Sequence, residues 1–462
     1  MPLEELKTIV GPGAWTTDAA ELEPHLSEPR GLVTGRTSIM LSPDSTEQVS
    51  AIVSTCAKAG VSIVPQGGNT GVCGGATPDE SGDQVLVSLS RLNKIRSVDP
   101  DDFSMTVEAG CILANVQDAA RNVDRLFPLS LGAEGSCQIG GNLSTNAGGI
   151  NVIRYGSARQ QVLGLEVVLA DGTIWNGLRA LRKDSGGYDM KQIFIGSEGT
   201  LGVITAATLR LFPTYTQSST ALAAIESTTD AMRLLVRLQM ACPEQIVAFE
   251  LMTDTAFSLA MRHGENLSSP FDKSYPCYAL MEASSGGEDA ALQSALATAI
   301  DDGDVLDAVL AKNSNEAGRL WRIRHAIPEA QGKEGVSIKH DISVPIGRID
   351  DFMQQAEAVI LKQIPDARIV AFGHLGDGNL HYNISQPIGA DPDEFRKVAV
   401  AASKSVYDLV ADLGGSFSAE HGVGVLKKAY LNEYRSNEEL DLMRTLKQAM
   451  DPQNTLNPGK VI

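Results

Sequence analysis

Three glycine-rich runs in the first half of the chain place the strongest constraint on its fold. They cover Pro65 to Pro78, Gly132 to Gly149 and Gly196 to Gly202. Because these runs hold so few large side chains, they are suited to lie against a ligand or another backbone rather than to form a core. The first run follows the apolar segment Val61 to Val64, an arrangement typical of loops whose backbone N–H groups bind phosphate.

The glycine spacing excludes two common nucleotide-binding motifs. The run from Pro65 to Pro78 contains neither GxGxxG nor GxxxxGK[ST], so it is neither a Rossmann fingerprint nor a Walker loop. Taken alone, each run is compatible with a tight or buried loop that binds nothing. Three such runs in one half of the chain favour a large phosphorylated cofactor.

Composition and charge exclude several classes of protein. The 462 residues predict two to four domains, at roughly 100–200 residues per domain. A net charge of −19 argues against nucleic acid or an anionic membrane as partner. Six scattered cysteines without a CxxC motif are typical of a reduced, intracellular protein. With no signal peptide and no apolar run near ~20 residues, we expect a cytoplasmic protein without a membrane span.

Local patterns predict an α+β protein in two main parts that meet near Pro213. In the first part, Ser45 and Thr46 begin an amphipathic helix, and Asp171-Gly172 form the turn of a hairpin from Leu165 to Trp175. After Pro213 longer helical patterns alternate with strands. These helices are expected at Ala231–Met240, Ile349–Lys362, Pro392–Leu413 and near Asn437–Met450.

Two motifs near the C-terminus suggest a metal site, namely GHLGDGNLHYN from Gly373 and SAEHG from Ser418. The imidazoles of His374 and His381 with the carboxylate of Glu420 form a common three-ligand set for a divalent ion. Seven residues apart on one straight strand, the two histidines would face opposite sides. We therefore predict two strands, 368–372 and 380–384, joined by a turn at 376–379. By itself such a site is equally compatible with a hydrolase.

His421 directly follows Glu420, so the two side chains diverge. If Glu420 faces the metal, His421 can serve a substrate as general base, a role that suits histidine because an ordinary imidazole titrates near neutrality. The alternative is a structural hydrogen bond. Arg324 and Lys339 lie upstream, and Lys339 ends an apolar strand-like run, where a carboxylate is needed to balance its charge. The alternative for this pair is a role as surface cations.

Six motifs together resemble the FAD-linked D-2-hydroxy acid dehydrogenases of the vanillyl-alcohol-oxidase-like superfamily, and most closely their D-2-hydroxyglutarate dehydrogenases. They are PQGGNTG, GSCQIGGNLSTNAGG, GSEGTLGVIT, GHLGDGNLHYN, SAEHGVG and LNPGK, spread from about residue 40 to the C-terminus. The resemblance implies an FAD-binding domain of the PCMH type at 1–214. It also implies a substrate- and metal-binding α+β cap at 215–420, and a segment at 421–462 that returns to the FAD domain.

The resemblance also assigns cofactor residues. The FAD is expected to be non-covalent, because no histidine lies between Pro65 and Pro78 to tether it. His374, His381 and Glu420 would bind the metal, expected to be Zn²⁺. The residues that would hold FAD are Pro65, Gly67, Gly68, Asn69, Thr70, Gly71, Gly135, Ser136, Gly140, Gly141, Thr145, Gly148, Gly202, Ile204 and Asn457.

For the substrate, a small anionic 2-hydroxy acid, the resemblance implies four contacts. Arg324 and Lys339 would hold its far carboxylate, Asn383 would contact it, and His421 would remove the hydroxyl proton while a hydride passes to flavin N5. One position departs from the family, because Pro328 stands where hydroxyglutarate enzymes tend to carry a threonine. D-lactate and glycolate therefore stay open as substrates beside 2-hydroxyglutarate.

The sequence has no Fe–S or haem motif that could take electrons from reduced flavin. We therefore expect an external acceptor, namely an electron-transfer flavoprotein, a quinone or a cytochrome, in preference to oxygen. Two further interpretations are a non-redox flavin transferase and a non-catalytic flavin subunit of an oxidase. A homodimer is compatible with the sequence, which leaves the oligomeric state open.

Overall fold

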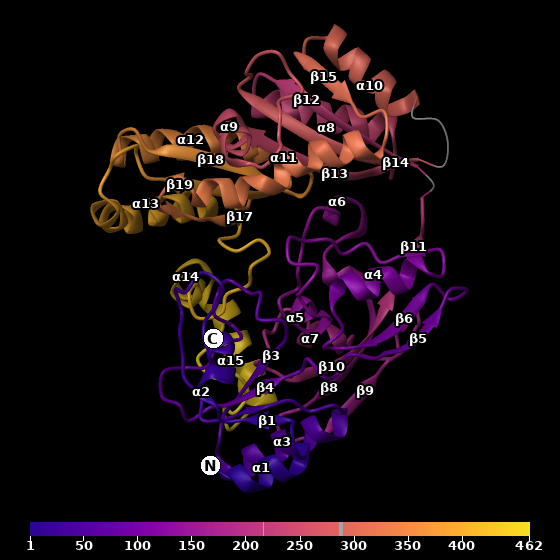
Figure 1. Cartoon of the computed structure of the whole chain (residues 1–462), viewed down its shortest axis with the longest axis vertical. Coiled ribbons are helices and arrows are strands. Elements are labelled where there is room, and N and C mark those ends of the chain that lie inside the picture. Colours follow the sequence, from indigo (N-terminus) through magenta and orange to yellow (C-terminus); the bar gives the residue numbers. More distant parts are fainter. Residues whose placement is uncertain (216, 286–289) are drawn as a thin grey trace. The chain divides into compact units, whose positions relative to one another are not determined.

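The computed structural model describes residues 1–215, 217–285 and 290–462, and these form two compact units (Figure 1). The first unit comprises Met1–Gly148, Gly156–Thr214 and Glu420–Ile462. The second unit comprises Gly149–Tyr155 and Tyr215–Ala419. Both contain helices packed with sheets, so the predicted α+β class is confirmed.

Two main sheets build the first unit. The four-stranded sheet has the order β1 (Trp15–Thr16), β2 (Met40–Leu41), β4 (Val85–Ser88) and β3 (Ile63–Gln66), and β2, β4 and β3 run parallel. The five-stranded antiparallel sheet has the order β5 (Ile95–Asp99), β6 (Ser104–Glu108), β10 (Val203–Arg210), β8 (Val162–Val168) and β9 (Ile174–Gly177). A small pair joins β7 (Arg125–Leu126) to β11 (Phe212–Pro213).

Sequence signals explain the local structure of the first unit. Helix α3 (Thr46–Ala59) begins where the Ser45 hydroxyl accepts the N–H of Gln48, and it ends at Gly60 with φ of 63°. Its buried apolar face confirms the predicted helix, and the pairing of β8 with β9 confirms the predicted hairpin. The other helices are α1 (Leu3–Val10), α2 (Ala19–Leu22), α4 (Leu113–Arg121), α5 (Ile139–Ser144), α7 (Lys191–Phe194), α14 (Lys428–Tyr434) and α15 (Asn437–Met450).

An eight-stranded antiparallel sheet forms the centre of the second unit. Its order is β15 (Asp307–Leu310), β12 (Gln217–Ile225), β14 (Cys277–Ser285), β13 (Ile246–Thr253), β18 (Arg368–Gly373), β19 (Asn379–Ser385) and β16 (Ser337–Ile338), and β17 (Asp341–Ser343) also pairs with β19. The helices of this unit are α6 (Val152–Tyr155), α8 (Thr228–Ala241), α9 (Asp254–His263), α10 (Ala290–Asp301), α11 (Ser314–Gly332), α12 (Ile349–Gln363) and α13 (Pro392–Asp412). The predicted helices after Pro213 are therefore confirmed.

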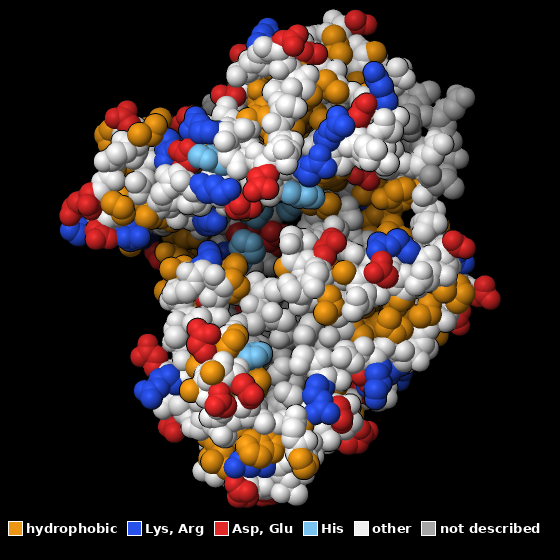
Figure 2. Space-filling view, in the orientation of Figure 1, with side chains coloured by type: hydrophobic (Ala, Val, Ile, Leu, Met, Phe, Trp, Pro, Cys, Tyr) orange, Lys and Arg blue, Asp and Glu red, His pale blue; other side chains and the backbone are white. Residues whose placement is uncertain are grey.

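Acidic and basic side chains lie interspersed on the face drawn in Figure 2. The net charge of −19 is therefore not gathered into one acidic field on that face. Within the described ranges, no helix has both the length and the apolar composition needed to cross a membrane.

Candidate active site

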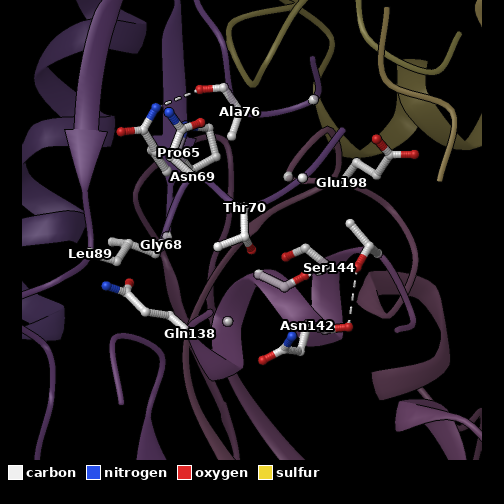
Figure 3. Close-up of a pocket in the computed structure, with 18 of the residues that line it drawn as sticks. Pro65, Gly68, Asn69, Thr70, Ala76, Leu89, Gln138, Asn142, Ser144 and Glu198 are labelled. Carbon is white, nitrogen blue, oxygen red and sulfur yellow. Dashed lines mark hydrogen bonds between the residues drawn. The ribbon is translucent and has the colours of Figure 1, made fainter. Parts of the chain in front are cut away.

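The three glycine-rich runs line one pocket in the first unit, which we call the glycine-loop pocket. Its empty volume is about 860 Å³, which includes space that is open to solvent. In Figure 3 the loop with Gly68, Asn69 and Thr70 lies opposite helix α5 with Asn142 and Ser144. The Glu198–Gly202 segment adds a third wall, and His421 also lines the pocket.

The polar groups around this pocket suit a phosphorylated ligand. Across residues 1–215, 217–285 and 290–462, the backbone N–H groups of Gly68 to Gly71 donate no hydrogen bond to protein. The buried oxygens Gln138 Oε1 and Asn142 Oδ1 likewise have no partner in these ranges. Since buried polar groups are normally paired, this set points to a ligand that supplies both acceptors and donors. The residues present therefore fit FAD.

Most of the predicted cofactor residues line the glycine-loop pocket. Those that do are Pro65, Gly67, Gly68, Asn69, Thr70, Gly71, Gly140, Gly141, Thr145, Gly202 and Ile204. Three predicted residues do not line the pocket, namely Gly135, Ser136 and Gly148. Asn457 is connected to the pocket only through residues that line it. The amide of Asn457 donates to the carbonyl oxygens of Gly75 and Glu198, both of which line the pocket, at 2.8 Å each.

We expect Gly141→Ala to weaken FAD binding without unfolding the chain. A Cβ at Gly141 would meet no protein atom within 4 Å, and alanine is favoured over glycine inside helix α5. The methyl group would instead take space in the pocket, at a cost of about 1–3 kcal/mol, or roughly 5- to 150-fold in affinity. FAD titration of apoprotein measures this. Gly318→Ala, in helix α11 and also without a neighbour, is the control; equal FAD affinity in both variants would contradict the assignment.

The two histidines of the predicted metal motif lie at one end of the sheet in the second unit. Strands β18 and β19 pair antiparallel as predicted, with Phe372 opposite His381. His374 follows β18 directly, and the ring centroids of His374 and His381 are 5.8 Å apart at an interplanar angle of 76°. The predicted hairpin is therefore confirmed, and it brings both imidazoles together.

A buried carboxylate fixes the orientation of His374. Glu250 on β13 is fully buried, and its Oε1 lies 2.5 Å from His374 Nδ1 while its Oε2 lies 2.6 Å from Arg324 Nε. Burial opposes ionisation of Glu250, but the adjacent His374 and Arg324 outweigh it and hold the pKa of this carboxyl at about 2. Because an ionised carboxylate only accepts, Nδ1 carries a proton, and in the neutral imidazole Nε2 then has the lone pair that a metal needs.

The contact with Glu250 gives Arg324 a protein carboxylate as its partner, whereas the sequence predicted a substrate carboxylate or a surface position. Its guanidinium is buried, lies over the Phe372 ring at 4.6 Å and is paired with Glu250. Lys339, its predicted partner for the substrate carboxylate, is exposed between β16 and β17. Asn383 is buried, donates to Gln331 Oε1 at 2.9 Å and accepts the N–H of His340 at 3.1 Å. Its substrate contact stays a prediction.

Asp341 is a further metal-ligand candidate that sequence reasoning missed. It lies on β17 opposite His381 on β19, and its Oδ1 accepts a hydrogen bond from Asn379 at 3.0 Å. The carbonyl oxygen of Asp341 also accepts the N–H of Ala419 at 3.3 Å. This bond holds Ala419, the last residue of the second unit, at the same strand.

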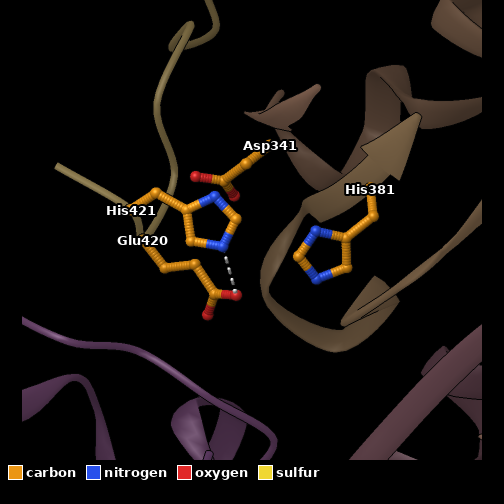
Figure 4. Close-up of side chains that lie close together, drawn as sticks. All are labelled: Asp341, His381, Glu420 and His421. Atoms are coloured by element: carbon orange, nitrogen blue, oxygen red, sulfur yellow. Dashed lines mark ion pairs between the residues drawn. The ribbon is translucent and has the colours of Figure 1, made fainter. Parts of the chain in front are cut away.

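Figure 4 shows Asp341 and His381 on their strands, with Glu420 and His421 on the loop that follows Ala419. His421 Nε2 lies 3.7 Å from Glu420 Oε1, the ion pair marked in the figure, so the prediction that these two side chains diverge is wrong. Within the first unit, His421 lines the glycine-loop pocket. Within the second unit, the imidazoles of His374 and His381 and the carboxylate of Asp341 are ligand types that suit a divalent ion such as Zn²⁺.

Comparison with known proteins identifies the family of this chain. The family described as FAD linked oxidases, C-terminal domain, matches residues 215–461, and the FAD binding domain family matches residues 37–177. The chain belongs to the FAD-linked oxidase family. Within it, this flavoprotein is an FAD-dependent D-2-hydroxy acid dehydrogenase, so the resemblance in sequence is confirmed.

Two relatives of this flavoprotein match over almost its whole length. D-2-hydroxyglutarate dehydrogenase of Stutzerimonas stutzeri is 37% identical, over 99% of this chain and 98% of its own. The mitochondrial D-2-hydroxyglutarate dehydrogenase of Bos taurus is 39% identical, over 100% of this chain and 83% of its own. The solved structure of p-cresol methylhydroxylase with bound substrate shares the fold, with a TM-score of 0.76 at 15% identity, over 99% and 96% of the two chains. The predicted PCMH-type fold is confirmed.

Proposed function

We propose that this flavoprotein oxidises a D-2-hydroxy dicarboxylate such as D-2-hydroxyglutarate to the 2-oxo acid and passes the electrons to an external acceptor. The names of its relatives support the substrate, because the matches span at least 99% of this chain and 83% to 98% of the relatives. One structural observation carries the mechanism. His421 lines the glycine-loop pocket, where the flavin would bind.

Each group has one role in this proposal. His374, His381 and Glu420, with Asp341 as an additional candidate, would hold a divalent metal that fixes the α-carboxylate and α-hydroxyl of the substrate. His421 accepts the hydroxyl proton. When bound, FAD supplies the hydride acceptor. Arg324, Lys339 and Asn383 orient the rest of the substrate. One relative is named as mitochondrial and the other, from Stutzerimonas stutzeri, is not, so the compartment of this chain stays open.

The decisive experiment is anaerobic mixing of the purified flavoprotein with a panel of 2-hydroxy acids. The panel pairs D with L enantiomers and dicarboxylates with D-lactate and glycolate. We expect the flavin absorbance to bleach fastest with D-2-hydroxyglutarate. Faster bleaching by D-lactate or glycolate would replace the substrate assignment. No bleaching by any acid of the panel would contradict the proposal and favour a non-redox transferase or a non-catalytic subunit.

Metal removal is expected to abolish turnover while FAD stays bound. The metal-ligand histidines belong to the second unit, whereas the glycine-loop pocket belongs to the first. Dialysis against a chelator, followed by measurement of flavin content, metal content and bleaching rate, tests this. Activity should return on addition of Zn²⁺ or another divalent ion. Full activity in metal-free protein would refute the ligand assignment.

Lys339→Ala is expected to harm dicarboxylate substrates more than D-lactate. A lost charge-assisted hydrogen bond costs about 1.5–3 kcal/mol, or roughly 10- to 150-fold in kcat/KM. Lys333→Ala, which removes another exposed lysine nearby in sequence, is the control. Arg324→Lys tests the buried cation without leaving Glu250 uncompensated. Equal losses for both substrates would argue against a role at the far carboxylate.

A further inference from the structure

We propose that Glu198 is the positioning residue that holds the loop carrying His421 against the glycine-loop pocket. This inference rests on the proposed function only for the role of His421; the contact itself lies within the first unit. Glu198 comes from the GSEGTLG run, which sequence analysis treated as a backbone element only.

The carboxylate of Glu198 binds two consecutive backbone groups just beyond His421. Its Oε1 accepts the N–H of Val423 at 2.6 Å, and its Oε2 accepts the N–H of Gly424 at 2.9 Å. Two successive N–H groups that converge on one anion form a recognised anion-binding arrangement of the backbone. Glu198 is 8% exposed, so solvent offers little replacement for these bonds.

The surrounding backbone is shaped to admit this carboxylate. A Cβ at Gly422 would lie 2.8 Å from Glu198 Oε1, and a Cβ at Gly75 would lie 2.8 Å from Oε2. Glu198 itself has φ of 52°, a left-handed conformation that costs energy in a residue with a side chain. A glycine would meet this local requirement better, so we attribute the presence of glutamate to its side-chain contacts.

Other residues fix Glu198 in turn. Its carbonyl oxygen accepts the Asn457 amide, which links the C-terminal tail to the same point. Burial raises the pKa of Glu198, and the N–H groups of Val423 and Gly424 together with the buried cations Lys427 and Lys460 oppose this rise. Glu198 and His421 both line the glycine-loop pocket. Removal of the carboxylate should therefore displace His421 without removing any group that contacts substrate.

The test compares Glu198→Gln with wild-type full-length protein in two measurements. Glutamine replaces one carboxylate oxygen with an NH₂ group that cannot accept an N–H, so in the same position it can pair with only one of the two N–H groups. Hydrogen–deuterium exchange of apoprotein should show faster exchange for the peptide covering 420–427. In FAD-loaded protein we expect flavin reduction to be slower by a factor on the order of 10², while the substrate Kd changes little. Glu198→Asp, too short to reach both N–H groups, is the second variant if the first fails to fold.

Glu166→Gln is the matched control, because Glu166 is another buried carboxylate of the first unit, paired with Arg96 away from the pocket lining. It should leave exchange of 420–427 unchanged. Unchanged exchange in Glu198→Gln, or unchanged flavin reduction, would overturn the inference. Failure of wild-type protein to bleach with any 2-hydroxy acid would instead refute the proposed function, and the exchange result would still decide whether Glu198 holds the loop.

Discussion

His421→Asn should slow anaerobic flavin reduction by about 10²–10⁴-fold, the usual contribution of a positioned general base. Asparagine keeps the polarity and approximate size of the side chain but cannot accept the hydroxyl proton. FAD content and substrate Kd should stay close to wild type, because the loop contacts of Glu198 are retained. Metal content should also stay close to wild type, because the variant keeps the proposed ligand Glu420. Stopped-flow absorbance at several substrate concentrations separates the reduction rate from Kd.

The matched control for this variant is His325→Asn, which replaces an exposed histidine stacked on Trp321 in helix α11. It should reduce flavin at the wild-type rate. An unaltered reduction rate in His421→Asn would remove this residue as the base. A large rise in substrate Kd with little change in rate would instead assign it to substrate binding.

Among the variants discussed, Glu250→Gln should lower the free energy of unfolding the most, and it should also lower the affinity for the metal. The neutral side chain would leave Arg324 buried without its counter-charge, and breaking a buried ion pair in this way costs about 3–5 kcal/mol. It would also free His374 to take the wrong tautomer, and loss of such a partner lowers metal affinity by about 10–100-fold. Denaturant unfolding of metal-free protein and metal titration measure the two effects separately.

Glu282→Gln provides the comparison for this variant. Glu282 is a carboxylate on the neighbouring strand β14, opposite Ala248 of β13, and it accepts the Trp321 indole N–H at 2.8 Å. Burial raises the pKa of Glu282, so Glu282→Gln removes less negative charge from the protein than Glu250→Gln does. Metal affinity should be unchanged. If both variants lost metal equally, the effect would come from general disruption of the sheet and not from the Glu250–His374 contact.

Local sequence signals were sufficient to predict the strands and loops that position the candidate site. The turn glycines between His374 and His381 predicted the β18–β19 hairpin, and the glycine runs predicted the walls of the pocket. These features depend on residues close together in the chain. The orientation of His374, in contrast, depends on Glu250, 124 residues away, and no local pattern marks that glutamate.

Asp341 and Glu198 were missed for a related reason. Asp341 becomes a candidate only through its register with His381 across two strands, which sequence alone did not supply. Glu198 lies in a glycine-rich run, where backbone approach was the expected role, and its partners Val423 and Gly424 come from a distant loop. A single acidic residue among glycines is the signal that could have drawn attention to it.

The short segment Gly149–Tyr155 belongs to the second unit although its neighbours in the chain belong to the first. Ile153 packs so closely on the backbone at Gly376 that a Cβ there would lie 2.5 Å from its side chain. A fragment that starts at Tyr215 would therefore lack a piece of its own hydrophobic packing, next to the His374 turn. Gene fragments for expressing this unit alone should supply residues 149–155 through a linker, and domain exchange with relatives should move both pieces together.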